Sequence, residues 1–379
     1  MGEHERKYML RALELAVRAQ GRTSPNPLVG AVLVKDGRII GEGFHRRAGG
    51  LHAEVEALRA AGEAARGATA FVTLEPCAHH GRTPPCVDAL IEAGVAQVYS
   101  AGEDPNPHVN GGGHARLRAA GIQVQTGLCS EHAREINRPF FKYIACGQPW
   151  VTAKFAMSLD GKLATRRGDS QWITGEAARG RGHQLRNMAD AVLVGSGTVL
   201  ADDPRLTTRL PEYEGDVRHP LRIVVDSSGR VPRTSRIFAA DLPGDAALAT
   251  TAAAAEKHCR GLQSQGVQVW RLPADGSGRV DMGGLLDEIG RRDMLTLLVE
   301  GGGELTGSLV DDGLLDEVYA FVAPLLIGGR AAPGPVGDPG AGALAQALRL
   351  GNMVTEQIGA DVLIRANVRN PDEGESDRG

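Results

Sequence analysis

Three short motifs, H-A-E at 52–54, E-P-C at 75–77 and P-P-C at 84–86, decide the fold of the first part of this chain. H-A-E opens a predicted helix and E-P-C follows a predicted strand, so the motifs predict an α/β domain. One imidazole and two thiolates form a donor set that Zn²⁺ prefers, and three protein ligands leave a fourth position open, as in catalytic sites. We therefore predict that His52, Cys77 and Cys86 bind one zinc ion.

Glu54 lies two positions after His52, where its carboxylate can reach the open position of the metal site without being a ligand. A carboxylate in that place can take a proton from water and deliver it to a ring nitrogen or to a departing amine. The motifs together have the H-x-E…P-C…C order of the nucleobase deaminases. We predict that Glu54 is the catalytic acid and base.

The eight residues between the two cysteines, 78–85, are a departure from the C-x-x-C spacing that deaminases usually have. We expect this insertion to contribute to the substrate pocket, and its histidines and arginine suit an anionic or hydrogen-bonding substrate. Two alternatives remain open. His79 or His80 could be the fourth ligand of a structural zinc, or the two cysteines could be buried thiols without a metal.

Strand and helix patterns alternate along the chain and restart near residues 147–149. In the first part the periodicity predicts helices at 8–19, 52–61, 87–93 and 115–120, Pro76 in a first helical turn, and strands at 30–34, 38–41, 69–74, 95–101 and 122–126. In the second part it predicts strands at 150–157, 191–195, 221–225, 267–272, 295–299, 317–322 and 361–366, and helices at 177–188, 282–291 and 305–311. We predict two α/β domains, 1–147 and 148–368, and a disordered acidic tail, 369–379.

Composition limits the classes of partner. The formal net charge of -4 does not favour a nucleic-acid-binding surface. The N-terminus is charged and no apolar segment follows it, and the longest apolar runs are too short to cross a bilayer. We expect a cytoplasmic protein with no membrane or nucleic-acid partner, in which cysteines are candidate ligands and not disulfides.

A series of longer motifs occurs in the order found in one known family. They are T-S-P-N-P-L-V-G at 23–30, H-A-E-V-E-A-L at 52–58, E-P-C-A-H-H-G-R-T-P-P-C at 75–86, D-P-N-P at 104–107, K-F-A-M-S-L-D-G-K at 154–162, S-Q-W-I-T at 170–174, T-V-L-A-D-D-P-R-L-T at 198–207 and V-E-G-G-G-E-L at 299–305. With these motifs the sequence resembles the bifunctional deaminase–reductases of riboflavin biosynthesis over about residues 5–366. The spacing between the cysteines is usual in that family.

The resemblance implies an α/β fold with an N-terminal cytidine-deaminase-like three-layer domain and a C-terminal dihydrofolate-reductase-like domain. It implies zinc-dependent deamination of 2,5-diamino-6-ribosylamino-4(3H)-pyrimidinone 5′-phosphate. NADPH-dependent reduction of the ribosyl side chain would follow and give 5-amino-6-ribitylaminouracil 5′-phosphate. It also implies a homo-oligomer, a dimer or tetramer.

Site residues of the deaminase domain follow from the same resemblance. It implies that the substrate pocket is lined by Asn26, His45, His79 and Arg82. Other readings exist for two of them, because Asn26 stands between two prolines and suits a turn, and His45 could be a solvated loop histidine.

In the second domain, Glu300 and the glycines at 301–303 lie between a predicted strand and a predicted helix. Glycines there let backbone N–H groups approach a phosphate. The spacing is not that of a Rossmann fingerprint, since position 306 is a threonine. The resemblance implies a cofactor site formed by Ala156, Trp172, Thr198, Asp202, Gly302, Gly303, Glu304 and Leu305. It implies substrate contacts from Lys154, Ser170, Arg186, Leu206, Arg209 and Glu300.

Lys154 is the predicted catalytic residue of the reductase, with Asp202 as another group that could assist the proton transfer. Arg186 and Arg209 suit a sugar phosphate, because a guanidinium binds phosphate oxygens through two hydrogen bonds. Either arginine could instead be a surface residue, Trp172 a core residue and Asp202 a cap.

Two other functions are compatible with parts of the sequence. One is a nucleic-acid or nucleoside deaminase fused to a substrate-presenting nucleotide-binding domain. The other is a structural zinc module joined to a nucleotide-sensing domain. Glu54 argues against the second, because a structural zinc site has no use for a carboxylate beside the metal.

Overall fold

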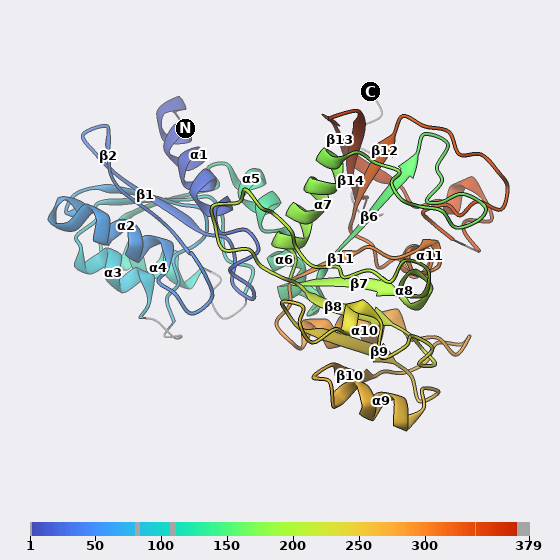
Figure 1. Cartoon of the computed structure of the whole chain (residues 1–379). Helices are drawn as coiled ribbons and strands as arrows, with labels where there is room; N and C mark the ends of the chain where they lie inside the picture. Colours follow the sequence, from blue (N-terminus) through green and yellow to red (C-terminus); the bar gives the residue numbers. More distant parts are fainter. Residues whose placement is uncertain (1, 80–83, 107–110, 338, 370–379) are drawn as a thin grey trace. The chain divides into compact units, whose positions relative to one another are not determined.

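Two sheets organise the chain in the computed structural model, which describes residues 2–79, 84–106, 111–337 and 339–369. One sheet belongs to the unit Met1–Gly147 and the other to the unit Gln148–Gly379 (Figure 1). The predicted disordered tail lies, from residue 370 on, outside the described residues. No helix among the described residues has the length and apolar character that a membrane span requires.

The sheet of the first unit has the order β2-β1-β3-β4-β5. Its strands are β1 (Gly30–Lys35), β2 (Arg38–Phe44), β3 (Thr69–Val72), β4 (Gln97–Ser100) and β5 (Gln123–Thr126). Strands β1 and β2 form an antiparallel hairpin, whereas β3, β4 and β5 are parallel. The hairpin turn at Asp36 and Gly37 has positive φ at both residues, 50° and 73°, which is the backbone that the predicted Asp-Gly turn requires.

Helices cover both faces of this sheet and give three layers. The helices are α1 (Glu3–Val17), α2 (Ala53–Ala61), α3 (Cys86–Glu92), α4 (Gly112–Ala119), α5 (Ser130–Ile136) and α6 (Arg138–Cys146). Alternate residues of β1 point to opposite faces. Ala31 and Leu33 pack in a core with α2, α3 and α4, and Val32 and Val34 pack in a core with α1 and α5. The three-layer prediction for this domain is confirmed.

The local differences in the first unit have simple causes. Pro76 was predicted in a helical turn, but it lies in an irregular segment after β3, and helix α3 begins ten residues later with Pro85 as its N-cap. That prediction was wrong because Pro85 also suits a helix start. Helices α5 and α6 were not predicted. Each is short, at 7 and 9 residues, and buries one side chain, Ala133 or Phe140. Both are shorter than the window of about 11–18 residues over which helical periodicity is recognised.

The second unit has a nine-stranded sheet with the order β10-β9-β8-β7-β11-β6-β12-β14-β13. The strands are β6 (Trp150–Ser158), β7 (Ala191–Gly195), β8 (Leu221–Val225), β9 (Ala246–Thr250), β10 (Gln268–Arg271), β11 (Thr296–Val299), β12 (Glu317–Ala323), β13 (Leu350–Ile358) and β14 (Asp361–Val368). All neighbouring pairs from β10 to β12 are parallel, and the two pairs that β14 forms are antiparallel.

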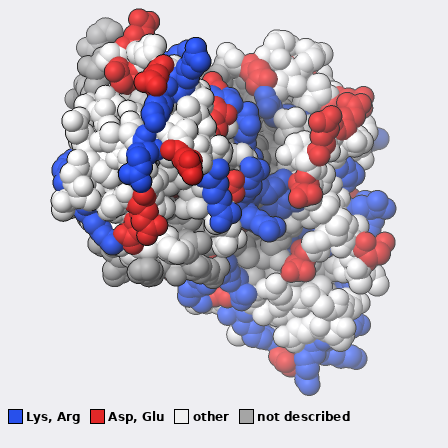
Figure 2. Space-filling model, turned by 90° about the vertical axis from the view of Figure 1, so that its left-hand side faces the viewer, with Lys and Arg blue, Asp and Glu red and all other residues white. Residues whose placement is uncertain are grey.

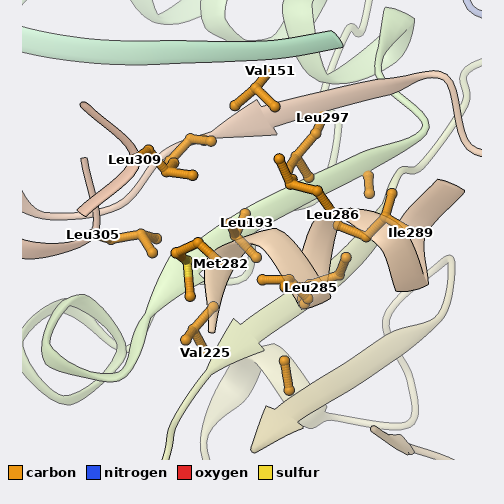
Figure 3. Packing of buried hydrophobic residues seen from close by; sticks show 14 of the residues in the cluster. Val151, Leu193, Val225, Met282, Leu285, Leu286, Ile289, Leu297, Leu305 and Leu309 are labelled. Carbon is orange, nitrogen blue, oxygen red and sulfur yellow. The ribbon is translucent and has the colours of Figure 1, made fainter. Parts of the chain in front are cut away.

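Helices lie on both faces of this sheet as well. They are α7 (Glu176–Met188), α8 (Ser196–Asp202), α9 (Glu256–Gln263), α10 (Met282–Gly290) and α11 (Gly303–Asp311). Figure 3 shows one of the two cores, in which Leu285 of α10 and Leu305 of α11 pack around Leu193 of β7. The other core contains Val192 and Val194 of the same strand with side chains of α7 and α9. Because the strands from β10 to β12 are parallel, their carboxyl ends lie at one edge of the sheet.

Four of the named helices and strands of the second unit were not predicted, namely β9, β13, α9 and α8, a seven-residue helix that buries only Ser196 and Val199. Strand β13 has an exposed side chain at most positions, so it has no apolar alternation. Strand β9 is buried throughout but made largely of alanine, which has low strand propensity. Helix α9 buries only Cys259 and Leu262. The two strands thus lack the signals on which the prediction of strands depends, whereas α8 and α9 are only 7 and 8 residues long.

Candidate active sites in the two units

The predicted metal ligands come from three different elements of the first unit. His52 is the N-cap of α2, Cys77 lies in the irregular segment after β3, and Cys86 is the first residue of α3. The Nδ1 atom of His52 lies 3.1 Å from Sγ of Cys86 and 3.6 Å from Sγ of Cys77. A hydrogen bond from the Cys86 thiol lowers the pKa of Cys77. This favours the thiolate of Cys77, the form that binds metals.

The three donor atoms fit a tetrahedral zinc ion. They all lie within 4.8 Å of one another, and among the described residues they are the one such group of histidine, cysteine and acidic side chains. Zinc bonds of about 2.0–2.3 Å require donors that are close in this way. His79 is exposed and outside the group, and His80 lies outside the described residues. When bound, zinc acts as a Lewis acid and lowers the pKa of water towards neutrality.

Glu54 lies at the second position of α2, beside these ligands. Its side chain is almost fully buried, and its Oε2 atom has no hydrogen-bond partner among the described residues. A buried carboxylate oxygen without a partner is costly and calls for a ligand. Burial raises the pKa of Glu54 to about 7, and the neighbouring Cys77 adds to the shift. A carboxyl group with this pKa exchanges protons readily near neutral pH.

A cavity of about 360 Å³ opens beside the metal ligands. Asn26, His45, His52, Glu54, Cys77 and His79 all line it. His45 is only 3% exposed, so its reading as a solvated histidine was wrong. Its Nδ1–H donates to the Leu51 carbonyl at 3.0 Å, which leaves Nε2 to accept from the Asn26 amide at 3.0 Å. Arg82 lies outside the described residues.

Residues for which no role was predicted also line this cavity, among them Glu75, Asp104, Asn106 and Phe140. Asp104 and Asn106 belong to the D-P-N-P motif, so the motif was the signal that could have found them. Burial raises the pKa of Asp104 to about 6. Phe140 lies on α6, a helix that was not predicted, and no pattern in the sequence marks it.

In the second unit, two helices begin directly after neighbouring parallel strands. Helix α8 follows β7, with Gly195 as its N-cap, and α11 follows β11, with Gly302 as its N-cap. Helix N-termini at the carboxyl edge of a parallel sheet suit the phosphates of a nucleotide. A Cβ atom at Gly302 would approach Oγ1 of Thr198 to 3.2 Å, and one at Gly303 would meet the carbonyl of Gly334 at 2.7 Å. Glycine at both positions therefore lets the start of α11 pack closely against Thr198 and Gly334.

These helix starts border a cavity of about 950 Å³, large enough for a dinucleotide beside a small substrate. The cavity is lined by eleven of the predicted reductase residues, namely Lys154, Ala156, Ser170, Trp172, Thr198, Asp202, Glu300, Gly302, Gly303, Glu304 and Leu305. Its lining also includes Ser227, Ser228 and Arg230 after β8 and Arg279, none of which was predicted. Arg186, Leu206 and Arg209 do not line it.

Glu300 is the buried centre of the charged groups at this site. Arg186 donates to Glu300 from Nε at 2.5 Å and from Nη2 at 2.9 Å, and Nζ of Lys154 lies 3.5 Å from the same carboxylate. Burial would raise the pKa of Glu300, but Arg186 and Lys154 outweigh it and lower the pKa to about 2. Glu300 is therefore ionised, and Lys154 lies beside it on the lining of the cavity.

A short segment after α8 holds Leu206 and Arg209. Leu206 is buried and has a left-handed backbone, with φ of 51°, which is unusual for a leucine. The Arg209 guanidinium donates to Oγ1 of Thr207 at 3.2 Å and is otherwise exposed. The backbone N–H of Arg209 donates to Nδ1 of His183 at 3.3 Å. Arg186 donates to the Thr207 carbonyl, so it lies against this segment.

Trp172 is not a core residue and Asp202 is not a cap, which were the alternatives for these two side chains. Trp172 is 67% exposed, with the Arg179 guanidinium 4.6 Å from its ring centroid, so it is not a core residue. Asp202 is the last residue of α8, and its carboxylate accepts a hydrogen bond of 3.4 Å from the Ser170 hydroxyl. Both side chains face the cavity.

Comparisons with known proteins agree with both sites. Residues 2–101 match the cytidine and deoxycytidylate deaminase zinc-binding region, and residues 149–364 match the RibD C-terminal domain. The fold and the two sites thus define a zinc-dependent deaminase joined to an NADPH-dependent reductase. The chain belongs to the RibD family of riboflavin biosynthesis, whose members combine these two domains.

The chain is similar to its relatives over nearly its whole length. It is 43% identical to riboflavin biosynthesis protein RibD of Actinobacillus pleuropneumoniae over 96% of this chain and 95% of that protein. It is 44% identical to RibD of Escherichia coli over 94% and 97% of the two chains. The solved structure of Acinetobacter baumannii RibD has a TM-score of 0.86 at 38% identity, and covers 97% of this chain and 99% of its own.

A second solved structure names both activities. It is a diaminohydroxyphosphoribosylaminopyrimidine deaminase and 5-amino-6-(5-phosphoribosylamino)uracil reductase from Thermotoga maritima. Its TM-score is 0.83 at 36% identity, and it covers 97% of this chain and 99% of its own. The fold class, the two enzyme activities, zinc and NADPH are thereby confirmed.

Proposed function

We propose that the first unit deaminates 2,5-diamino-6-ribosylamino-4(3H)-pyrimidinone 5′-phosphate and that the second reduces the ribosyl group of the product to ribityl. The observation that carries this proposal is the pairing of two cavities in one chain. One contains a His-Cys-Cys donor set with a buried carboxylate, and the other has two glycine-bearing helix starts beside Lys154. The relatives that name these two activities support it.

In the deaminase cavity we assign the proton transfers to Glu54 and the zinc ion to His52, Cys77 and Cys86. Glu54 takes one proton from the attacking water and passes it to the ring nitrogen; it then takes a second proton from the hydroxyl group added to the ring carbon and passes it to the departing amine, which leaves as ammonia. Asn26, His45, His79 and Arg82 are proposed to bind the substrate. We add Asp104 and Asn106, because both line the cavity with Glu54.

In the reductase cavity NADPH supplies the hydride. We assign Ala156, Trp172, Thr198, Asp202, Gly302, Gly303, Glu304 and Leu305 to its binding. Lys154 is proposed as the catalytic proton donor, because the ionised Glu300 beside it cannot give a proton. Ser170, Arg186, Leu206, Arg209 and Glu300 are proposed to position the substrate.

The bonds of Arg186 refine its role. Three of its hydrogen bonds go to Glu300 and the Thr207 carbonyl. We therefore assign Arg186 mainly to holding Glu300 and the segment around Thr207. The exposed Arg209 guanidinium is the better candidate for the sugar phosphate.

The proposed substrate is a small molecule, and we propose neither a nucleic-acid nor a membrane partner. The deaminase cavity of about 360 Å³ suits a single pyrimidine ribosylamine phosphate. Acidic side chains lie among the basic ones on the face drawn in Figure 2, whereas nucleic acid favours a basic surface. We further propose a homo-oligomer, a dimer or tetramer, that works in the cytoplasm, where free thiols such as Cys77 stay reduced.

Glu54→Gln tests the deaminase assignment. The amide keeps the size of the side chain but cannot carry the proton, so ammonia release should stop. Zinc content should stay at about one ion per chain, because Glu54 is not a ligand. NADPH oxidation with the deaminated intermediate is the matched control and should be unchanged. A variant that still releases ammonia at the wild-type rate contradicts the assignment.

A further inference from the structure

The carboxylate of Glu75, in the E-P-C motif, accepts hydrogen bonds from four backbone N–H groups. Oε2 accepts from Gly111 at 2.9 Å and from Asp104 at 3.3 Å, and Oε1 accepts from Gly113 at 2.9 Å and from His114 at 3.2 Å. The side chain has no exposed surface. A buried carboxylate with four such donors is fully satisfied, and bonds to a charged acceptor are stronger than neutral ones.

A close backbone approach joins the same two segments independently. A Cβ atom at Gly113 would come within 1.9 Å of the carbonyl oxygen of Pro76. Only glycine allows the start of α4 to lie against the E-P-C segment in this way. The bonds from Gly111, Gly113 and His114 and this contact fix the start of α4 to the E-P-C segment, and the bond from Asp104 joins the chain at that residue to the same carboxylate.

The E-P-C segment and the chain at Asp104 both carry side chains of the deaminase cavity. Cys77, a metal ligand, follows Glu75 by two residues, and Asp104 is held through its backbone N–H. The Asp104 side chain is 8% exposed and lines the cavity that also contains Glu54. Glu75 also borders this cavity, but its side chain has no exposed surface: its carboxylate lies at the N-terminus of α4, where its hydrogen bonds come from backbone N–H groups and Nδ1 of His114 lies 3.8 Å from Oε1.

We propose that Glu75 is a positioning residue of the deaminase, which holds Asp104 at the place in the cavity where it contacts the substrate. This inference rests on the proposed function, in which Asp104 is a substrate-binding residue. Glu75 does not touch the substrate in this account. Its effect on the reaction passes through Asp104.

Glu75→Gln is the first test, because glutamine has the same length. Its NH₂ group replaces one acceptor oxygen and faces two N–H donors, so two of the four bonds are lost. We expect kcat/KM for ammonia release to fall about tenfold to a hundredfold, the cost of small displacements in an active site. Zinc content and NADPH oxidation should not change. Glu75→Asp keeps the charge on a shorter side chain, so we expect a smaller loss, and it serves in place of Glu75→Gln if that variant does not fold.

A double-mutant cycle with Asp104→Asn separates positioning from a purely structural role. If Glu75 acts through Asp104, Glu75→Gln should change kcat/KM less than about threefold once Asp104 is already Asn. Additive effects, or loss of zinc from Glu75→Gln, overturn the proposal. Asp104→Asn with wild-type kinetics also overturns it, since there is then no contact to position. The proposed function is judged separately by Glu54→Gln.

Discussion

Arg186 donates hydrogen bonds of 2.5 Å and 2.9 Å to the two carboxylate oxygens of Glu300 inside the reductase unit. The two side chains are 13% and 6% exposed, so water screens this pair little. Lys154 contacts the same carboxylate from the cavity side. The ion pair thus connects Lys154, the proposed proton donor, to the segment that holds Leu206 and Arg209, because Arg186 also donates to the carbonyl of Thr207.

Replacing Arg186 by leucine leaves the Glu300 carboxylate buried with only Lys154 as a cationic partner. Removing one partner of a buried pair costs about 3–5 kcal/mol. We expect the free energy of unfolding of the reductase unit, measured by urea denaturation, to fall by about that amount, and NADPH oxidation to be lost. Ammonia release should persist. Arg186→Lys keeps the charge but not the two parallel bonds, and should lose less stability. Unchanged stability of Arg186→Leu would contradict this reading of the pair.

Lys154→Met removes the ammonium group and keeps most of the side-chain volume. We expect kcat for NADPH oxidation to fall by about a hundredfold or more, the usual contribution of a general acid. The KM for NADPH should change little, since the helix starts of α8 and α11 remain. Steady-state kinetics with the deaminated intermediate measures both constants. Wild-type turnover in this variant means that Lys154 is not the proton donor.

The stability of the reductase unit should depend on pH through His183. Burial, together with the neighbouring Arg186, lowers the pKa of His183 from 6.5 to about 4. Between these two values the unfolded chain binds more protons than the folded one, so the free energy of unfolding falls as the pH falls from 6.5 towards 4. His183→Leu removes this dependence. Urea denaturation at several pH values in this window gives the free energy of unfolding of each protein. The wild type should lose its advantage over His183→Leu as the pH falls. If the two free energies differ by the same amount at every pH, the role given to His183 is wrong.

Loss of the zinc ligand Cys77 should separate the two activities. Cys77→Ser replaces a thiolate by a poor zinc ligand, so we expect loss of zinc and of ammonia release. The reductase cavity lies wholly within the second unit, and therefore reduction of the deaminated intermediate should stay near the wild-type rate. Chelation of zinc from the wild-type protein should reproduce this result. If both activities disappear together, the units do not function independently.

The sequence predicted the metal site well because its signals are local. The three ligands lie in short motifs next to Pro85 and the start of α2, and their residue types alone specify the chemistry. The hairpin at Asp36 and Gly37 and the buried strand β8 were predicted for the same reason, since turn chemistry and a continuous apolar run are visible in a few residues.

Contacts between distant segments could not be predicted from the sequence in this way. Glu75 belongs to the E-P-C motif, but the four backbone N–H groups that donate to its carboxylate lie 29 to 39 residues further along the chain. Phe140 lines the deaminase cavity from α6, a nine-residue helix far along the chain from the metal-binding motifs. Arg186 was predicted as a phosphate clamp because an arginine suits phosphate, whereas its partner Glu300 is 114 residues away.

The most direct test of the central claim is a two-step assay with the purified, zinc-loaded protein. The diaminopyrimidinone ribosylamino phosphate is added first without NADPH and then with it, while ammonia and NADPH are followed separately. The account predicts ammonia release before NADPH is added, and NADPH oxidation only afterwards and only if deamination has occurred. NADPH oxidation without prior ammonia release, or no ammonia from the zinc-loaded protein, would contradict it.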